Sequence, residues 1–386
     1  MTSKRARSCS DGDRSMIRQL RGREVKVASF CFLLELLKQS VAFPSQVYPG
    51  LDLSCSPGLG NRPHTVAQTA SYKSRRQQAV NFRVVSVTFA AAATRSIAGT
   101  HPPVATEGCP WHTGRVTSFD AAARAAAAHF DFPCAFGVTD LAGPIACSGD
   151  VDAAFPFASV TKPLAGYAAL VAIDRKLLRL DAPAGPEGST VRHLLAHASG
   201  LPFEEGAVLG APGKRRVYSN RGFDVLGGVV EEATGTPFPE WLEETVLIPL
   251  GMSATECEGS PAHSGRGSVA DLLAFGREML SPTLVSSELW REAITPQFPG
   301  ISGVLPGYGR QADNAWGLGV EIRDSKAPHW TDASFPPSAY GHFGQSGSFL
   351  WVDPTVGRAG AFLGSRPFGA PHREAWPALT KAMREA

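Results

Sequence analysis

Apolar residues recur with a regular period only after the first third of the chain. Up to about residue 115, apolar stretches are short and are interrupted by Pro, Gly and Ser, which is typical of a chain that builds no packed core. The alanine-rich segment Phe119–Phe130 then predicts a helix that Pro133 ends. We therefore expect a disordered N-terminal extension over residues 1–115 and a folded domain over residues 116–386.

The folded part begins with a strand period and continues with a helical one. Cys134–Val138 and Gly143–Ser148 predict two short strands, joined by a turn at Asp140–Pro144. Apolar positions then recur at helical spacing, which predicts helices over Thr161–Lys176, Thr190–Gly200, Gly222–Thr234, Phe238–Leu247 and Ser268–Leu280.

The last quarter of the chain returns to alternation. Strands are expected over Trp316–Ile322, Tyr340–Phe343, Ser346–Val352 and Arg358–Leu363, and a terminal helix over Trp376–Glu385. Together these elements predict an α+β fold, in which an antiparallel sheet is flanked by helices. A mostly helical lobe, over approximately residues 158–311, is inserted between the two halves of the sheet.

Charge divides the chain in the same place as periodicity. The net charge of +2 conceals 15 Lys+Arg against 5 Asp+Glu in residues 1–100, a net of +10, and hence −8 for the remainder. The basic extension is either an unstructured segment without a role, which its composition favours, or an arm for targeting or for binding a polyanion. An acidic domain offers no footprint for nucleic acid, so we expect a small-molecule or peptide substrate. The sequence indicates no oligomeric state.

No apolar run approaches the length that a bilayer requires, so no membrane span is expected. Two stretches resemble the core of a signal peptide. Val27–Leu34 is followed at once by Glu35, and Val84–Ala93 lies too deep in the chain for an ordinary signal. A cytoplasmic location is therefore favoured, with export as the alternative.

Cysteine and histidine spacing gives no metal site. The seven cysteines include no Cys-x-x-Cys pair. Cys134 and Cys147 flank the expected hairpin and could pair, although buried thiols in a reducing compartment are favoured. His193 and His197 are four apart on a helix, but Leu194 stands where a zinc peptidase has glutamate. We expect neither a metal nor a cofactor.

The segment Ser159-Val160-Thr161-Lys162 combines a serine with a lysine one helical turn away. Pro163 is tolerated only in the first turn of a helix, so it places Ser159 at the helix start. There a serine hydroxyl has a nearby amine that can activate it, and backbone N–H groups that can stabilise a developing oxyanion. By itself the same serine would be read as a helix N-cap.

Two further motifs complete a possible site. Tyr218-Ser219-Asn220 and His342-Phe343-Gly344 each occur once, and each alone would be an ordinary turn or a glycine-rich strand. All three motifs occurring together in this order argues against three independent coincidences.

On these residues the chain resembles the serine β-lactamase-like superfamily, which includes class C β-lactamases, D-alanyl-D-alanine carboxypeptidases and related esterases. The resemblance covers roughly residues 118–386. It rests on Phe157–Lys162, Tyr218–Asn220 and His342–Gly344, and Val191–Leu201 strengthens it.

The resemblance implies a role for each motif residue. Ser159 would be the acylated nucleophile, and Lys162 would have a depressed pKa and share a proton with Tyr218. Tyr218 would be the general base for acylation and would activate water for deacylation. Asn220 would bind the substrate and orient Lys162.

The resemblance also implies that the strand at Gly344 lies edge-on to the substrate, where glycine gives room for close approach. The N–H of Gln345 would be the second oxyanion donor, beside that of Ser159. His342 departs from the lysine that many members have at this position. A neutral histidine holds a carboxylate less strongly than a permanent cation does, which favours a neutral ester or amide substrate.

We therefore expect a serine hydrolase that works through an acyl-enzyme, with an esterase favoured. A D-alanyl-D-alanine carboxypeptidase or a β-lactamase is the first alternative. A catalytically silent binding or scaffold relative is the second, and the presence of Ser159, Lys162, Tyr218 and Asn220 argues against it.

Overall fold

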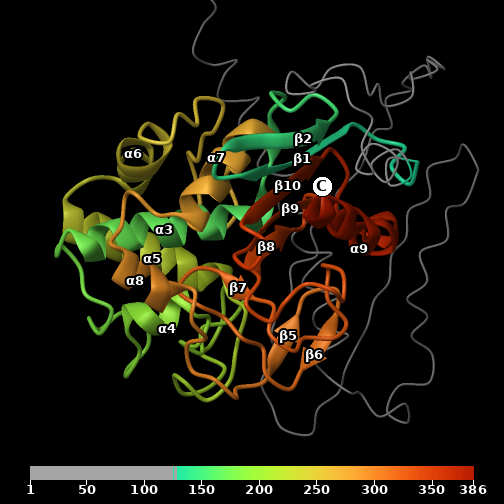
Figure 1. The fold of residues 1–386 in the computed structure, drawn as a ribbon. Coiled ribbons are helices and arrows are strands. Elements are labelled where there is room, and N and C mark those ends of the chain that lie inside the picture. Colours follow the sequence, from blue (N-terminus) through green and yellow to red (C-terminus); the bar gives the residue numbers. More distant parts are fainter. Residues whose placement is uncertain (1–124, 126–127) are drawn as a thin grey trace, which may run out of the picture. The chain divides into compact units, whose positions relative to one another are not determined.

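The computed structural model describes Ala125 and residues 128–386. The expected N-terminal extension and most of the Phe119–Phe130 helix lie outside the described residues. The fold is α+β, as predicted: an antiparallel sheet has helices on both faces (Figure 1).

Six strands form the main sheet in the order β2-β1-β10-β9-β8-β7, and every neighbouring pair is antiparallel. They are β1 (Cys134–Asp140), β2 (Gly143–Ser148), β7 (Glu321–Ile322), β8 (Tyr340–Gly344), β9 (Ser348–Asp353) and β10 (Arg358–Gly364). The first hairpin joins the last strands through β1 and β10, where Phe136 lies opposite Phe362. All the helices of the inserted lobe therefore lie, in sequence, between strands of one sheet.

The sheet separates two apolar cores because successive side chains of a strand point to opposite faces. On one face, Ala361 of β10 packs with the core around α7 (Val269–Leu280), and Gly276 of α7 allows close approach to Ala359. On the other face, Phe362 joins an aromatic cluster beneath α9 (Ala370–Glu385).

The inserted lobe surrounds α3, the helix that follows Ser159. Every residue of α3 from Thr161 to Ile173 is buried, and a helix with apolar neighbours on all sides belongs in the centre of a domain. The remaining helices of the lobe are α4 (Val191–Leu195), α5 (Asn220–Thr234), α6 (Phe238–Leu242) with the π-helical turn Glu243–Leu247, and α8 (Ser287–Ala293). Three short strand pairs or turns complete it: β3 (Phe155–Pro156) with β4 (Arg266–Gly267), β5 (Gly303–Leu305) with β6 (Gly309–Gln311), and the 3₁₀ turn Ala158–Val160.

Three predicted elements differ from the structure for identifiable reasons. The strand expected over Trp316–Ile322 is limited to its last two residues, because the N–H groups of Leu318 and Gly319 donate to Ala293 and Leu195 rather than to a neighbouring strand. The helix expected over Thr190–Gly200 ends at Leu195.

The early end of α4 comes from its backbone. His197 adopts a left-handed conformation (φ 53°), which an α-helix cannot continue. The terminal helix α9 instead begins six residues earlier than expected, because His372 Nδ1 accepts a hydrogen bond from the Gly369 N–H and caps the start.

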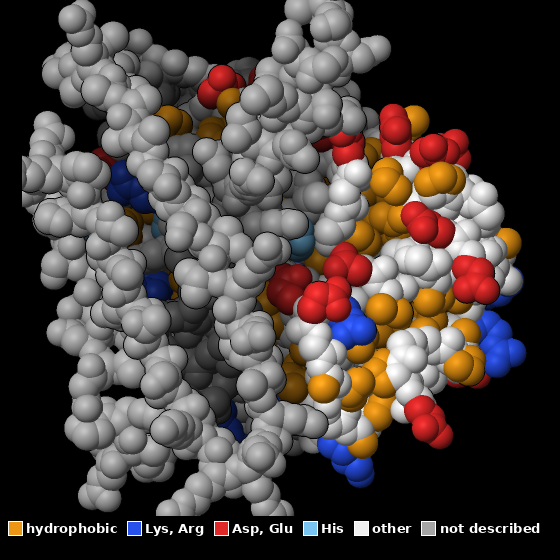
Figure 2. Space-filling model, turned by 180° about the vertical axis from the view of Figure 1, so that it is seen from behind, with side chains coloured by type: hydrophobic (Ala, Val, Ile, Leu, Met, Phe, Trp, Pro, Cys, Tyr) orange, Lys and Arg blue, Asp and Glu red, His pale blue; other side chains and the backbone are white. Residues whose placement is uncertain are grey.

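Cys134 is a free, buried thiol, so the possible pair with Cys147 is not formed. Among the described residues, no helix has the length and hydropathy needed to cross a membrane. Acidic and basic side chains are interspersed with apolar and uncharged ones over the coloured part of the face shown in Figure 2.

Candidate active site

Ser159 lies in a tight turn immediately before α3. The turn is 3₁₀-helical, and Ala158 has a left-handed backbone (φ 46°), which costs a non-glycine residue about 1–2 kcal/mol. Thr161 Oγ1 stabilises the turn by donating to the Ala158 carbonyl (2.6 Å) and accepting from the Gly265 N–H (2.9 Å). The Phe157 N–H donates to the Gly265 carbonyl (2.8 Å). A strained serine turn is thus fixed from both sides.

The Lys162 amine reaches the serine from the first turn of α3. Its Nζ lies 3.1 Å from Ser159 Oγ, 2.7 Å from Asn220 Oδ1 and 2.9 Å from the Ala262 carbonyl oxygen. The last two atoms can only accept, so they take two N–H groups of the amine. The third position faces Ser159.

Burial strongly favours the neutral form of this amine. Loss of solvent lowers the pKa of Lys162 to about 7, although the carboxylates of Asp224 and Glu204 oppose the shift. Lys162 Nζ lies over the Tyr218 ring, 4.7 Å from its centroid, and Ser159 lies between the amine and the phenol oxygen. A proton shared by Lys162 and Tyr218 would therefore pass through Ser159.

Tyr218 connects the serine to β8. Its hydroxyl lies 2.9 Å from His342 Nε2, and Ser159 is close enough to lower the pKa of the phenol. Burial raises the pKa of Tyr218, so the phenol is neutral at rest. The ring packs against His197, whose Nδ1 accepts the Ser219 N–H at 3.1 Å.

His197 therefore holds the segment that carries Tyr218. His193 instead caps α4 through Thr190, so the two histidines do not form a metal site. No group of three or more His, Cys, Asp or Glu side chains in the described part of the chain is arranged to hold a metal ion.

Gly344 lies against the serine turn. A Cβ on Gly344 would lie 2.3 Å from the Phe157 carbonyl oxygen and 3.1 Å from the Ser159 nitrogen. On its Cβ side, Gly344 is thus packed directly against the backbone of the serine turn. Ser348 Oγ also donates to the Phe157 carbonyl (2.7 Å), which fastens β9 to the same turn.

The next residue offers a backbone donor beside Ser159. The Gln345 N–H donates to no other residue among those the structure describes. Ser346 Oγ donates to the Pro156 carbonyl (2.7 Å) and keeps this hairpin next to the serine turn. This hairpin therefore carries a backbone donor next to the serine turn.

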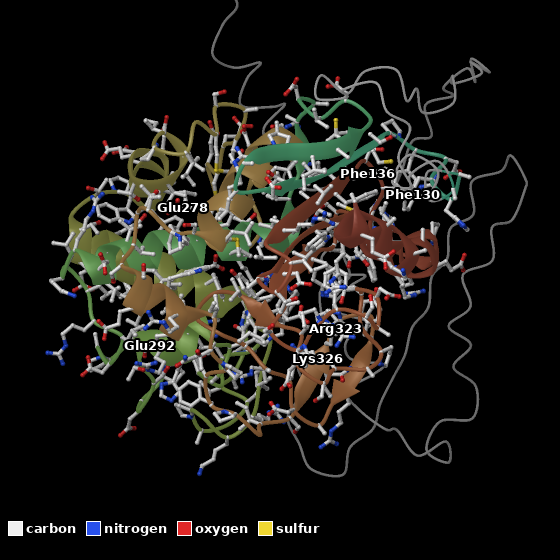
Figure 3. All side chains as sticks on the ribbon, in the orientation of Figure 1. Phe130, Phe136, Glu278, Glu292, Arg323 and Lys326 are labelled. Atoms are coloured by element: carbon white, nitrogen blue, oxygen red, sulfur yellow. The ribbon has the colours of Figure 1, made fainter. Side chains whose placement is uncertain are left out.

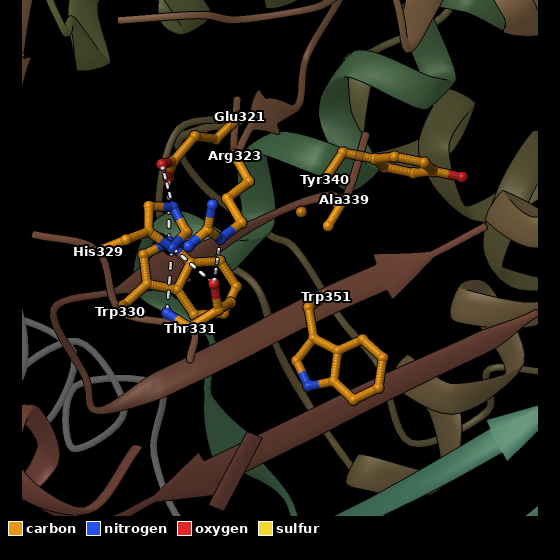
Figure 4. A pocket seen from close by; sticks show the side chains of 9 residues that line it. Glu321, Arg323, His329, Trp330, Thr331, Ala339, Tyr340 and Trp351 are labelled. Carbon is orange, nitrogen blue, oxygen red and sulfur yellow. Dashed lines mark hydrogen bonds and ion pairs between the residues drawn. The ribbon is translucent and has the colours of Figure 1, made fainter. Parts of the chain in front are cut away.

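The sequence analysis did not predict a buried polar cluster around Glu321, next to His342. Glu321 Oε2 lies 3.1 Å from His342 Nδ1 and 3.3 Å from Trp330 Nε1. Glu321 Oε1 lies 3.0 Å from His329 Nε2 and 3.3 Å from Lys326 Nζ. Figure 4 shows His329 and Trp330 beside the Glu321 carboxylate, next to a small pocket with a mainly apolar lining.

The cluster carries charge in spite of its burial. Desolvation alone would raise the pKa of Glu321, but Lys326 and the bonds from His329 and His342 hold it well below its usual range. Burial lowers the pKa of His342, although Glu321 opposes the shift. His342 is therefore neutral at pH 7.

One signal could have identified Glu321: it is the only charged residue in the apolar run Trp316–Ile322. Lys326 and His329 lie in a loop and gave no signal. Glu204, also missed, accepts a hydrogen bond from Asn220 Nδ2 (2.8 Å) and so fixes the amide with its oxygen towards Lys162.

Comparison with known proteins places this geometry in a family. The chain is 36% identical over 148 residues to esterase EstB of Burkholderia gladioli, which is 26% of this chain and 38% of that protein. It is 27% identical over 158 residues to the D-alanyl-D-alanine-carboxypeptidase/endopeptidase AmpH of Escherichia coli, 31% of this chain and 41% of that protein. The chain therefore spans only about two fifths of the length of these curated relatives.

A solved structure matches over a larger share. A β-lactamase of Mycobacterium bovis is 46% identical, with a TM-score of 0.66, and the match covers 69% of this chain and 97% of that one. A family model described as Beta-lactamase matches residues 110–383. The chain belongs to the β-lactamase family.

Proposed function

We propose that this protein is a serine hydrolase that forms an acyl-enzyme at Ser159, with carboxylic esters as its preferred substrates. Ser159 Oγ attacks the ester carbonyl, and its proton passes to Tyr218 as the phenol gives up its own proton to the neighbouring His342 Nε2. The Ser159 and Gln345 N–H groups bind the oxyanion. The alcohol leaves with a proton, and Tyr218 then activates the water that hydrolyses the acyl-enzyme.

Lys162 supports the nucleophile in this scheme. Its amine is within hydrogen-bond distance of Ser159 Oγ, and Asn220 and the Ala262 carbonyl hold it there. A desolvated amine beside the oxygen stabilises negative charge on it more strongly than the same amine in water would.

The preference for a neutral substrate rests on the state of His342. This ring is buried, and both its nitrogens are engaged, by Tyr218 and by Glu321. It has neither a charge nor a free donor to hold a substrate carboxylate.

Other cations near this site are also unavailable to a substrate. Lys326 is buried and bonded to Glu321 and to the Ala315 carbonyl. Arg216 is buried and donates to the carbonyls of Ala196, Gln297 and Asn314. It is close enough to the site to lower the pKa of His197. A peptide or an opened β-lactam that ends in a carboxylate would therefore find no free cation among these side chains.

The test is a substrate panel combined with active-site labelling. We expect purified protein to hydrolyse short-chain p-nitrophenyl esters with a kcat/KM at least about tenfold above its values for nitrocefin and for a D-alanyl-D-alanine peptide. A tenfold ratio corresponds to a difference of about 1.4 kcal/mol in transition-state stabilisation. A fluorophosphonate probe should modify Ser159, as located by peptide mass spectrometry. Preferred cleavage of nitrocefin or of the peptide would overturn the ester preference, and a reactive residue other than Ser159 would overturn the site.

A further inference from the structure

A line of neighbouring polar side chains runs from Lys162 through Ser159, Tyr218 and His342 to Glu321. Glu321 determines which atom donates and which accepts along this line. Four donors converge on that carboxylate, and an ionised carboxylate can only accept. The side chain at the end of the line is therefore an acceptor at both oxygens.

The acceptor role of Glu321 fixes the donor and acceptor roles of the next residues towards Ser159. Since Glu321 only accepts, His342 Nδ1 must carry a hydrogen, and in a neutral ring Nε2 is then bare. The Tyr218 hydroxyl must donate to Nε2, which leaves the phenol lone pairs facing Ser159. The Ser159 hydroxyl can thus donate to Tyr218.

The backbone before Glu321 packs against α3, the helix that follows the nucleophile. Gly319, two residues before Glu321, crosses α3 at Gly166 so closely that a Cβ on Gly166 would lie 2.7 Å from Gly319 Cα. The Gly319 N–H donates to the Leu195 carbonyl at 3.0 Å. The contact between Gly319 and Gly166 therefore joins the segment that carries Glu321 to the helix that follows Ser159.

We propose that Glu321 is a positioning residue for the reaction at Ser159: it holds the Nδ1–H of His342 and so makes Nε2 the final acceptor of the serine proton. The inference rests on the proposed function. As the Ser159 O–H bond breaks, its proton binds to Tyr218 Oη, while the Tyr218 proton moves to His342 Nε2. When the tetrahedral intermediate collapses, the same path in reverse delivers a proton to the leaving alcohol. No other reactant is required.

The charges around His342 suit this role. The groups that face the ring are Glu321 and Lys326 on one side, and Tyr218, His197 and Lys162 on the other. Only Glu321 is negative, and it lies within hydrogen-bond distance, so it stabilises the imidazolium that forms during proton transfer.

The first test compares Glu321→Gln with a matched control. We expect Glu321→Gln to lower kcat for a p-nitrophenyl ester by about 10²-fold with KM changed less than about threefold, since general-base contributions are of this size. Glu321→Asp, which keeps the charge, should recover at least about tenfold of the loss. Glu278→Gln is the control. Like Glu321, Glu278 is a buried carboxylate; it accepts a hydrogen bond from Tyr167 and lies well away from Lys326 in Figure 3. Its kcat should stay at the wild-type level, and an equal loss in both Gln variants would overturn the proposal.

The pH profile gives a readout that a purely structural role would not change. Glu321 raises the pKa of His342, so Glu321→Gln should move the acid limb of kcat/KM to lower pH. Asp224 raises the pKa of Lys162, so Asp224→Asn would move the limb only if neutral Lys162 were the acceptor. A limb that moves in Asp224→Asn and stays in Glu321→Gln would overturn the relay.

The third test measures wild-type protein and needs no Glu321 variant, so it remains decisive if Glu321→Gln fails to fold. Nitrogen-15 NMR of labelled histidine, assigned with His342→Gln, should show Nδ1 of His342 protonated and Nε2 bare at pH 7–8. The opposite tautomer would overturn the inference. If no ester in the panel is hydrolysed, the proposed function fails by itself, while the tautomer still decides whether Glu321 orients His342.

Discussion

Ser159→Ala is expected to reduce kcat for p-nitrophenyl ester hydrolysis by at least about 10³-fold, because no acyl-enzyme can form without the hydroxyl. The substrate can still bind beside the Ser159 and Gln345 N–H groups, so KM should change much less than kcat. The measurement is steady-state hydrolysis, with mass spectrometry of the protein after rapid quenching. Wild type should gain the mass of the acyl group, and the variant should not.

The control is Ser286→Ala. Ser286 is an exposed serine that precedes α8 and donates to Asp174, so its loss should leave kcat at the wild-type level. Ester turnover that survives in Ser159→Ala after this comparison would mean that the nucleophile lies elsewhere.

Gly344→Ala is expected to lower kcat/KM by about 10³-fold and the free energy of unfolding by about 1–3 kcal/mol. The added methyl group would lie 2.3 Å from the Phe157 carbonyl oxygen and 2.4 Å from Ser348 Oγ, so the serine turn and β8 must separate. This separation would displace Ser159 and the Gln345 N–H, and loss of one oxyanion donor alone costs about 10²–10³-fold. Thermal unfolding and ester kinetics on the same preparation would measure both effects.

A second glycine provides the matched control. Gly228 lies on the exposed side of α5, and a Cβ there would have no neighbour within 4 Å. Gly228→Ala should leave kcat/KM unchanged and should stabilise the protein by about 0.5–1 kcal/mol, because alanine favours a helix interior. If Gly344→Ala behaved in the same way, the close contact between β8 and the serine turn would have no role in the reaction.

The sequence predicted the elements whose pattern is local. The hairpin β1–β2, the helices α3, α5 and α7, and the strands β8 and β10 follow their apolar period closely, and the α+β fold follows from their order. The run at Trp316–Ile322 failed because its alternation suits a strand, yet its N–H groups bond to the helical lobe. Such partners, far apart in sequence, leave no mark on a local pattern.

The candidate site divides in the same way. Ser159 and Lys162 could be paired because one helical turn separates them, and the resemblance supplied Tyr218 and His342. Glu321 became visible only when the structure brought its carboxylate to His342. The close packing of Gly344 against the serine turn became visible only in the structure, and its expected place beside the substrate stays a prediction.

The pairing of β1 with β10 also bears on how this domain forms during synthesis. Thr139 lies opposite Ala359, about 220 residues later in the chain, so the middle of the sheet cannot close until the last strands have left the ribosome. The helices of the inserted lobe emerge first, so the apolar surface of α3 is only partly covered until β8, β9 and β10 have been synthesised. Chaperone dependence and aggregation of chains shortened before β10 are the expected results of this late closure.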